Sequence, residues 1–188
     1  MVGSLLSISM APNIYLLPFL VAMFVYSTNR LTDIMEDSKS HPPRTQFVIK
    51  NYTLMKFVNI ISFVLVIIFS LLHSFLTLLI ICIPMILVII YSVKLLPSYI
   101  FQKSRLKEYF LMKNIIVSIG WALIPVYVSV YTGVITPWIF LVSLFIFFRI
   151  FIGVIMFDLR DIHGDKIYKI DSIPIRFGEK RVKNLSLY

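Results

Sequence analysis

Long uncharged stretches dominate this chain, and charged residues are confined to the segments between them. Residues 1–29 carry no charge, residues 57–93 form 37 uncharged positions, and residues 114–148 form 35 more. A helix that crosses a bilayer needs ~20 mostly apolar residues, so each of the two longer stretches has room for two crossings. We expect one crossing over residues 11–26 and a helical hairpin in each longer stretch.

Breaks inside the longer stretches mark where each hairpin should turn. His73 and Ser74 are the only adjacent polar pair near the middle of residues 57–93. Gly133 and Pro137 interrupt the other stretch, and we expect its second helix to continue to Phe157. The pattern predicts an all-α, polytopic transmembrane bundle of about five spanning helices, with residues 1–188 forming a single domain.

Composition supports a membrane location. Hydrophobic residues make up 59% of the chain and the mean hydropathy is +0.91, whereas soluble domains are roughly half apolar. The first span lacks a basic segment before it and is followed by further spans, so we expect it to be retained rather than cleaved. The single cysteine, Cys82, leaves no intramolecular disulfide and no thiolate metal cluster available.

The net charge of +9 is distributed in a way that argues against nucleic-acid binding. Of the 18 Lys and Arg residues, 17 fall within residues 30–56, 94–113 and 160–188. Five crossings place these three segments on one side of the membrane, and short loops rich in Lys and Arg stay cytoplasmic. All nine acids share that side, so the cytoplasmic face is predicted to carry the chemistry.

The stretch "NRLTDIMED" follows the first apolar run and raises the question of why acids collect at a membrane boundary. Asn29, Asp33 and Asp37 are four residues apart, which on a helix stacks three oxygen-bearing side chains on one face. The last span ends in a second such cluster, "FDLRDIHGD". There Asp158, Asp161 and Asp165 fall within about 60° of one another on a helix. The two clusters are predicted to meet across the bundle.

Converging carboxylates repel one another unless a cation lies between them. Carboxylate oxygens suit Mg2+, which typically binds through a few carboxylates together with substrate phosphates. Basic and phenolic groups on the same side could hold the phosphate oxygens that the metal leaves free; they are Tyr91, Arg105, Lys107 and Lys166. This constellation favours a diphosphate substrate whose tail lies in the bilayer. The plainer reading of either cluster alone is a solvated helix end.

Two other kinds of residue were weighed for function. The histidines, His41, His73 and His163, are scattered over two sides, so a histidine metal site is not expected. Arg149 lies ~13 Å inward from Asp158 at the rise of an ideal helix. A charge at that depth is a functional candidate, although nine residues turn the helix by half a circle. Arg149 should therefore point away from the acidic cluster, toward a neighbouring helix or the membrane surface.

The two acidic motifs resemble those of a known family. "NRLTDIMED" with the following "HPPR", and "DLRDIHGDKIYKIDSIPIRFG", are similar to the two aspartate-rich motifs of the UbiA superfamily of intramembrane prenyltransferases. The intervening "YSVKLLPSYIFQKSRLKEYFLMKNIIVSIGWAL" resembles that family's stretch between its fourth and fifth helices. The resemblance covers about residues 20–185.

The resemblance implies a Mg2+-dependent transfer of an isoprenyl group, within the membrane, from a polyprenyl diphosphate to an aromatic, chlorin, haem or lipid-precursor acceptor. It implies catalytic roles for Asp33, Asp37, Asp161 and Asp165. The implied metal ligands are these four with Asn29 and Asp158, and the implied substrate-binding residues are Asn29, Arg44, Tyr91, Arg105, Lys107 and Lys166.

The sequence departs from the family pattern at Arg30, where a second acid is common, and at Lys169, where glycine is common. The family has about nine helices, whereas this chain is expected to span about the second to the start of the seventh, as a fragment or a short member. A non-catalytic remnant or assembly partner is therefore the alternative function. A cation transporter subunit and an alcohol phosphatidyltransferase fit less well, since the acids form two distant clusters at one face.

Overall fold

A computed structural model describes residues 12–94, 103–167 and 170–185, and within these ranges the regular structure consists of helices without strands. The helices in chain order are η1 Pro12–Tyr15, α2 Leu16–Thr32, α3 Ile34–Ser40, α4 Pro42–Lys50, α5 Tyr52–His73, α6 Phe75–Ser92, η2 Leu106–Glu108, α7 Met112–Ala122, α8 Ile124–Thr132, α9 Trp138–Ile167, α10 Ile173–Phe177 and α11 Glu179–Leu185.

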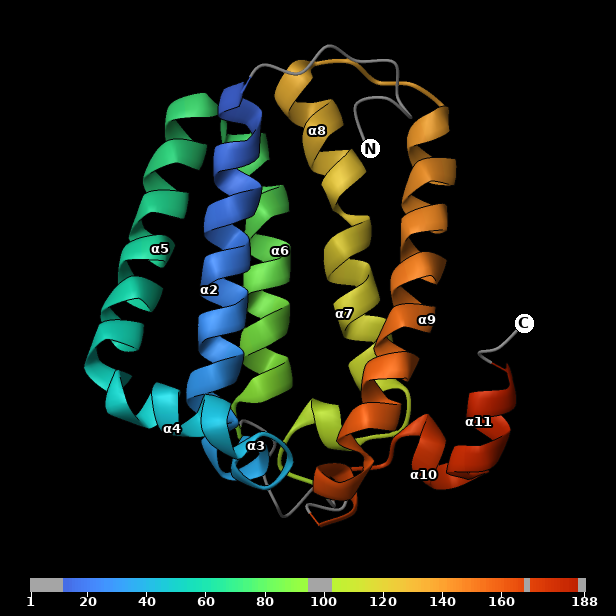
Figure 1. Cartoon of the computed structure of the whole chain (residues 1–188). Coiled ribbons are helices and arrows are strands. Elements are labelled where there is room, and N and C mark those ends of the chain that lie inside the picture. Colours follow the sequence, from blue (N-terminus) through green and yellow to red (C-terminus); the bar gives the residue numbers. More distant parts are fainter. Residues whose placement is uncertain (1–11, 95–102, 168–169, 186–188) are drawn as a thin grey trace.

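Four helical segments in the described part are long and apolar enough to cross a membrane: α5, α6, the continuous run of α7 and α8, and α9. The expected first span corresponds to α2, whose 17 residues extend roughly 26 Å at the rise of an α-helix. It runs alongside α5 and α6 in the same bundle (Figure 1). Ala11, the expected start of this span, lies outside the described residues.

Both predicted hairpins are confirmed. Ser74 adopts an extended conformation between α5 and α6, and its hydroxyl accepts a hydrogen bond from the backbone N–H of Thr77, which caps α6. Gly133 ends α8 with φ +71°, a left-handed conformation that glycine adopts without steric cost. The helix after this turn, α9, is longer than expected and continues ten residues past Phe157 to Ile167. Helix α9 packs against α3, α7 and α10.

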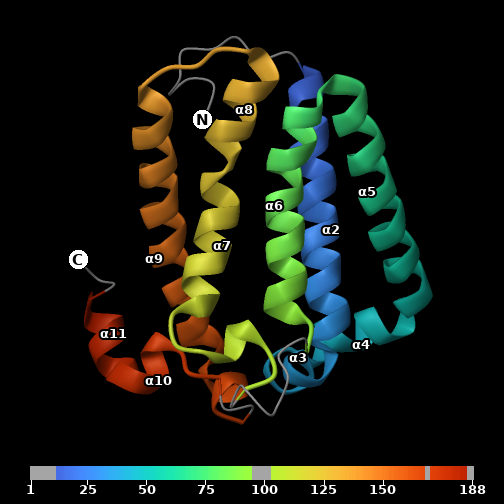
Figure 2. The same ribbon diagram turned by 180° about the vertical axis from the view of Figure 1, so that it is seen from behind.

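The helices form two groups that face each other. Helices α2, α5 and α6 lie on one side and α7, α8 and α9 on the other, as both views show (Figures 1 and 2). The short helices α3, α4, α10 and α11 gather at one end of the bundle, which we call the motif end because the acidic motifs lie there. The buried core cluster, to which both groups contribute, includes Leu17, Phe24, Val66, Val88 and Tyr127.

The outward faces of the long helices are apolar. Phe57, Ile60 and Leu72 on α5, and Phe145 and Phe148 on α9, are all more than half exposed. A soluble protein rarely leaves such continuous apolar surface open to water, whereas a bilayer-facing helix does. The chain is an integral membrane protein with a helical transmembrane fold.

Candidate active site

The first acidic motif does not lie on one uninterrupted helix. Helix α2 ends at Thr32, Asp33 has φ −104° and ψ 14°, and α3 begins at Ile34. The i to i+4 backbone hydrogen bonds nevertheless continue through the break, from the Asp33 N–H to the Asn29 carbonyl (2.9 Å) and from the Asp37 N–H to the Asp33 carbonyl (2.8 Å). The predicted helical spacing is therefore retained, although the chain changes direction between α2 and α3 at the end of the bundle.

Two of the acids in this motif pair with bases from the loop before α7. The Nζ of Lys107 lies 2.6 Å from Oδ1 of Asp33 and also contacts Glu36. Arg105 places Nη1 2.7 Å from Oε1 of Glu36 and 3.6 Å from Oδ1 of Asp33. Burial raises the pKa of the Asp33 carboxyl above its ordinary value, and the positive charge of Lys107 opposes that shift. Glu36 was not among the residues predicted from the sequence.

Asp37 pairs with bases that flank it in the sequence. Its Oδ2 lies 2.5 Å from Nη1 of Arg30, and its Oδ1 lies 3.3 Å from Nη2 of Arg44. Arg30 is the residue at which the chain departs from the family pattern, where a second acid is common. Here that departure supplies a direct counter-charge for the motif's own carboxylate.

The second motif reaches the first through His41. Its Nε2 lies 2.9 Å from Oδ1 of Asp161, on α9, and Nε of Arg160 lies 3.2 Å from the same oxygen. His41 is the residue between α3 and α4, and it is 120 positions from Asp161 in the sequence. The two motifs are thus in direct contact, as the sequence predicted from their placement at the same ends of two spans.

Asp158 occupies a different environment from the other acids of its motif. Its side chain is fully buried, its Oδ1 lies 2.5 Å from Nζ of Lys113, and its Oδ2 accepts a hydrogen bond from the Asn114 amide at 3.3 Å. Both partners belong to α7. The Nζ of Lys113 also lies 3.9 Å from Oδ2 of Asp165. Asp158 joins α9 to α7, while Asp161 and Asp165, one and two turns further along α9, face the first motif.

A cavity of about 170 Å³, which we call the polar cavity, lies between the two motifs. Asn29 and Tyr91 line it, together with Asp33, Glu36, Asp37, Asp161 and Asp165 as acids and Arg30, Arg44, Lys107, Lys113 and Arg160 as bases. Five carboxylates and five cationic side chains thus surround one space. Most of the predicted site residues are brought together there.

Three of the predicted residues lie outside the lining of the polar cavity. Asp158 is buried behind it against α7, and Arg105 reaches its acids from the side, through the ion pairs with Glu36 and Asp33. Lys166 is exposed near the end of α9. Lys113, which sequence reasoning counted only as part of a basic loop, lines the cavity instead. Its position at the start of an apolar helix is the signal that could have identified it.

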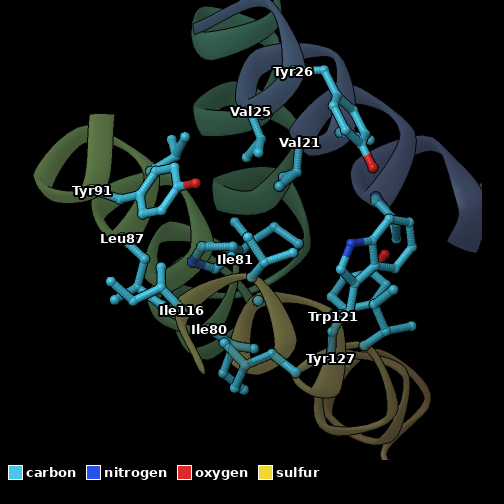
Figure 3. A pocket seen from close by; sticks show the side chains of 18 of the residues that line it. Val21, Val25, Tyr26, Ile80, Ile81, Leu87, Tyr91, Ile116, Trp121 and Tyr127 are labelled. Atoms are coloured by element: carbon cyan, nitrogen blue, oxygen red, sulfur yellow. The ribbon is translucent and has the colours of Figure 1, made fainter. Parts of the chain in front are cut away.

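A second pocket of about 200 Å³, the apolar pocket, lies deeper in the bundle between α2, α6, α7 and α8. Figure 3 shows its side chains, which include Val21, Ile81 and Leu87 as well as the aromatic rings of Trp121 and Tyr127. The two spaces have three lining residues in common: Tyr26, Asn29 and Tyr91. A charged compartment and an apolar one therefore meet at one boundary.

A helical membrane fold with paired acidic motifs around one cavity defines the general class of the protein, and comparison with known families identifies the family. The model of the UbiA prenyltransferase family matches residues 3–188. The chain belongs to the UbiA prenyltransferase family, which confirms the resemblance read from its motifs. Searches of curated proteins and of solved structures returned no match.

The donor set of the polar cavity fits a hard cation such as Mg2+. One buried oxygen of the cavity, Oδ2 of Asp165, accepts no hydrogen bond among the described residues, and its ion-pair partner, Nζ of Lys113, is 3.9 Å away. In the same part of the chain, no three His, Cys, Asp or Glu side chains converge as a metal-binding group. Mg2+ commonly uses only one or two carboxylates and completes its shell with water and substrate phosphate. Two facing motifs of this kind are suited to that mode of binding.

Proposed function

We propose that this protein transfers an isoprenyl group from a polyprenyl diphosphate to a small aromatic, chlorin, haem or lipid-precursor acceptor within the membrane, with Mg2+ as cofactor. The observation that carries this proposal is the shared boundary of the two spaces. A polyprenyl diphosphate has a charged head on a long apolar chain. The polar cavity could hold the diphosphate, and the adjoining apolar pocket could hold the prenyl chain. Membership of the UbiA prenyltransferase family supports the same reaction class.

The bases of the polar cavity are suited to the diphosphate. Arg44 and Arg30 can present planar guanidinium groups to phosphate oxygens, and Lys107 and Lys113 can add compact charges. These groups are already positioned by their carboxylate partners, so little reorganisation is needed where negative charge develops on the departing diphosphate. In the proposed reaction they stabilise that leaving group.

The residues proposed to hold Mg2+ are Asn29, Asp33, Asp37, Asp161 and Asp165. Oδ2 of Asp165 accepts no hydrogen bond among the described residues and can serve as a metal ligand. When bound, Mg2+ would neutralise charge on the diphosphate oxygens and favour their departure. Asp158 is proposed to act differently from the metal ligands. Its ion pair with Lys113 fixes that base at the edge of the cavity.

The boundary residues are suited to the reacting carbon. Cleavage of the carbon–oxygen bond to diphosphate leaves an allylic cation, which the acceptor attacks with loss of a proton. Tyr26 and Tyr91 line both spaces at the position where that carbon would lie, and aromatic faces attract cations. The apolar residues beyond them, including Trp121 and Tyr127, exclude water from the cation.

We propose that the motif end faces the cytoplasm, because the Lys and Arg residues of the short loops gather there. A thiol-reactive, membrane-impermeant reagent tests this on intact cells. A cysteine introduced at exposed Lys166 should be protected from the external reagent, and one introduced at exposed Ile135, in the turn before α9, should react. Reaction at position 166 alone would contradict the assignment.

The activity is tested with purified protein in lipid nanodiscs, radiolabelled geranylgeranyl diphosphate and a panel of the acceptor classes. Label should move into a lipid-soluble product only with Mg2+, and Asp33→Ala and Asp161→Ala should each lower the rate about 100-fold or more. Asp171→Ala is the matched control, because Asp171 pairs with Arg176 outside the cavity. Undiminished transfer in both cavity variants would reject the assigned site. Folded protein without transfer to any acceptor would favour the non-catalytic alternative.

A further inference from the structure

Arg149 is a charged side chain near the middle of a transmembrane helix. It is eleven residues past Trp138 and nine before Asp158 on α9, or roughly 16 Å and 13 Å at the rise of an α-helix. The hydrocarbon core of a bilayer is ~30 Å thick, so Arg149 lies close to its midplane. Charges at such depth are costly unless they are paired or hydrated.

Arg149 borders an apolar surface of α9 that faces away from the bundle. Phe145, Phe148 and Ile152, on the same side of α9, are all more than half exposed, and Arg149 itself is exposed. Val142 and Ile146, two turns and one turn before Arg149, are buried in the core, so Arg149 lies at the border between the packed and the exposed sides of α9. In the described part of the chain, Arg149 has no ion pair and no hydrogen bond from its side chain.

The guanidinium lies beside the smallest residue of this face. A Cβ atom built at Gly153 would come 4.0 Å from Nη1 of Arg149, so the side chain extends along α9 toward the motif end. Basic side chains near a helix end can reach the membrane surface by snorkelling, whereas the backbone of Arg149 is about three turns from Trp138 and about two and a half turns from Asp158. Because Gly153 has no side chain, the backbone of another helix can approach α9 closely beside the charge.

No acid of this sequence can neutralise Arg149 at that depth. The nine acids are Asp33 between α2 and α3, two residues of α3, one of η2, three in the last turns of α9, Asp171 between α9 and α10, and one of α11, and these parts of the chain lie at the motif end. The segments outside the described ranges contain no Asp or Glu. A second copy would also lack a carboxylate at the midplane.

We propose that the Arg149 face of α9, formed by Phe145, Phe148, Arg149, Ile152 and Gly153, docks a transmembrane helix that is not contained in this sequence and that carries an Asp or Glu at mid-bilayer depth. The carboxylate pairs with the guanidinium, the aromatic side chains pack against the partner's apolar surface, and Gly153 sets the distance of closest approach. This docking surface is independent of the prenyl-transfer proposal, because the polar cavity lies on the other side of α9.

The probe for this surface is a synthetic transmembrane helix of leucine and alanine with one central Glu. Matched helices carry Gln or Leu at that position. Fluorescence energy transfer between labelled protein and labelled helix is measured in phosphatidylcholine vesicles. The Glu helix should bind wild-type protein about three- to twentyfold more tightly than the Gln helix. Arg149→Gln should abolish this preference and Arg149→Lys should retain part of it.

A charge exchange keeps the test decisive if Arg149→Gln folds poorly. Arg149→Glu should bind a helix with a central Arg in preference to the Glu helix. Equal binding of the Glu, Gln and Leu helices, or a Glu preference that persists in Arg149→Gln, would overturn the proposal. Two further outcomes would overturn it in favour of another occupant: self-association of labelled copies that requires Arg149, or Arg149-dependent enrichment of phosphatidic acid around the protein without helix binding.

Discussion

Nε2 of His41 and Oδ1 of Asp161 lie 2.9 Å apart and connect the two acidic motifs across 120 positions of the chain. His41 belongs to the short link between α3 and α4, and Asp161 to the last turns of α9, so the contact holds the two groups of helices together at the motif end. A single imidazole thereby fixes the orientation of a carboxylate that is proposed to bind metal.

His41→Ala should weaken this connection without removing any proposed metal ligand. We expect the variant to lose about 1 kcal/mol of stability, the typical net value of one hydrogen bond. Its affinity for magnesium pyrophosphate should fall several-fold, because Asp161 would no longer be oriented. Thermal unfolding in detergent and calorimetric titration measure the two effects. His163→Ala, at an exposed position of α9, should change neither.

Lys113→Met should destabilise the protein more strongly than any substitution of an exposed lysine. It would leave Asp158, which is fully buried, without its counter-charge, and removal of one partner of a buried ion pair costs about 3–5 kcal/mol. The double variant Lys113→Met/Asp158→Leu should recover much of this loss. A double-mutant cycle on unfolding free energies measures the coupling, and additive effects of the two changes would contradict a direct pair.

Asp33→Asn should be more stable than the wild type at neutral pH, although we expect it to lose the proposed activity. Burial raises the folded-state pKa of Asp33 above its value in the unfolded chain. The folded state therefore retains the proton more readily, and the stability associated with it is present at low pH and lost as the pH rises through the folded pKa. Asparagine mimics the protonated form, so the gain should shrink on acidification.

Unfolding midpoints of wild type and Asp33→Asn, compared at pH 4 and pH 8, test this expectation. The difference between the two proteins should be larger at the higher pH. Asp171→Asn provides the control, because its ion pair with Arg176 is half-exposed and lies away from the cavity. A difference that grows on acidification would show that attraction to Lys107 outweighs burial at Asp33.

Gly120→Phe should shorten the prenyl chain that the protein accepts. Gly120 lines the apolar pocket, and a Cβ there would lie 3.9 Å from Cβ of Pro84, an ordinary contact. Gly120→Ala should thus be tolerated, whereas a phenyl ring would occupy the pocket. We expect kcat/KM for geranylgeranyl diphosphate to fall about tenfold or more relative to geranyl diphosphate. An unchanged ratio would place the prenyl chain elsewhere.

The membrane architecture could be predicted because charged residues are excluded from the bilayer interior and the turns between spanning helices must lie at its surface. Ser74 and Gly133 therefore marked both hairpin turns correctly. The convergence of the two motifs could also be predicted, since helices that end on one side of the membrane bring their ends into the same layer. The end of α9 was set too early, at Phe157, because its last ten residues are polar but pack on α3 and α10.

The pairing of individual side chains could not be read from the sequence. Lys107 reaches Asp33 and Glu36 from a loop about 70 positions away, and only the folded path of that loop decides which acids it meets. Asp158 shares a helical face with Asp161 and Asp165 within about 60°, yet one turn along the axis is enough to place it against α7 instead of the cavity. Helical angle alone does not encode depth.

Equal numbers of acids and bases around the polar cavity have a consequence for the order in which ligands are captured. A metal ion alone would bind the carboxylates and leave the guanidinium and ammonium groups without counter-ions. A diphosphate alone would bind these bases and leave the carboxylates without counter-ions. A metal–diphosphate complex would supply a cation for the carboxylates and an anion for the bases at the same time. Each component should therefore strengthen the binding of the other. In the proposed reaction, the cavity should therefore bind the metal–diphosphate complex in preference to either component alone.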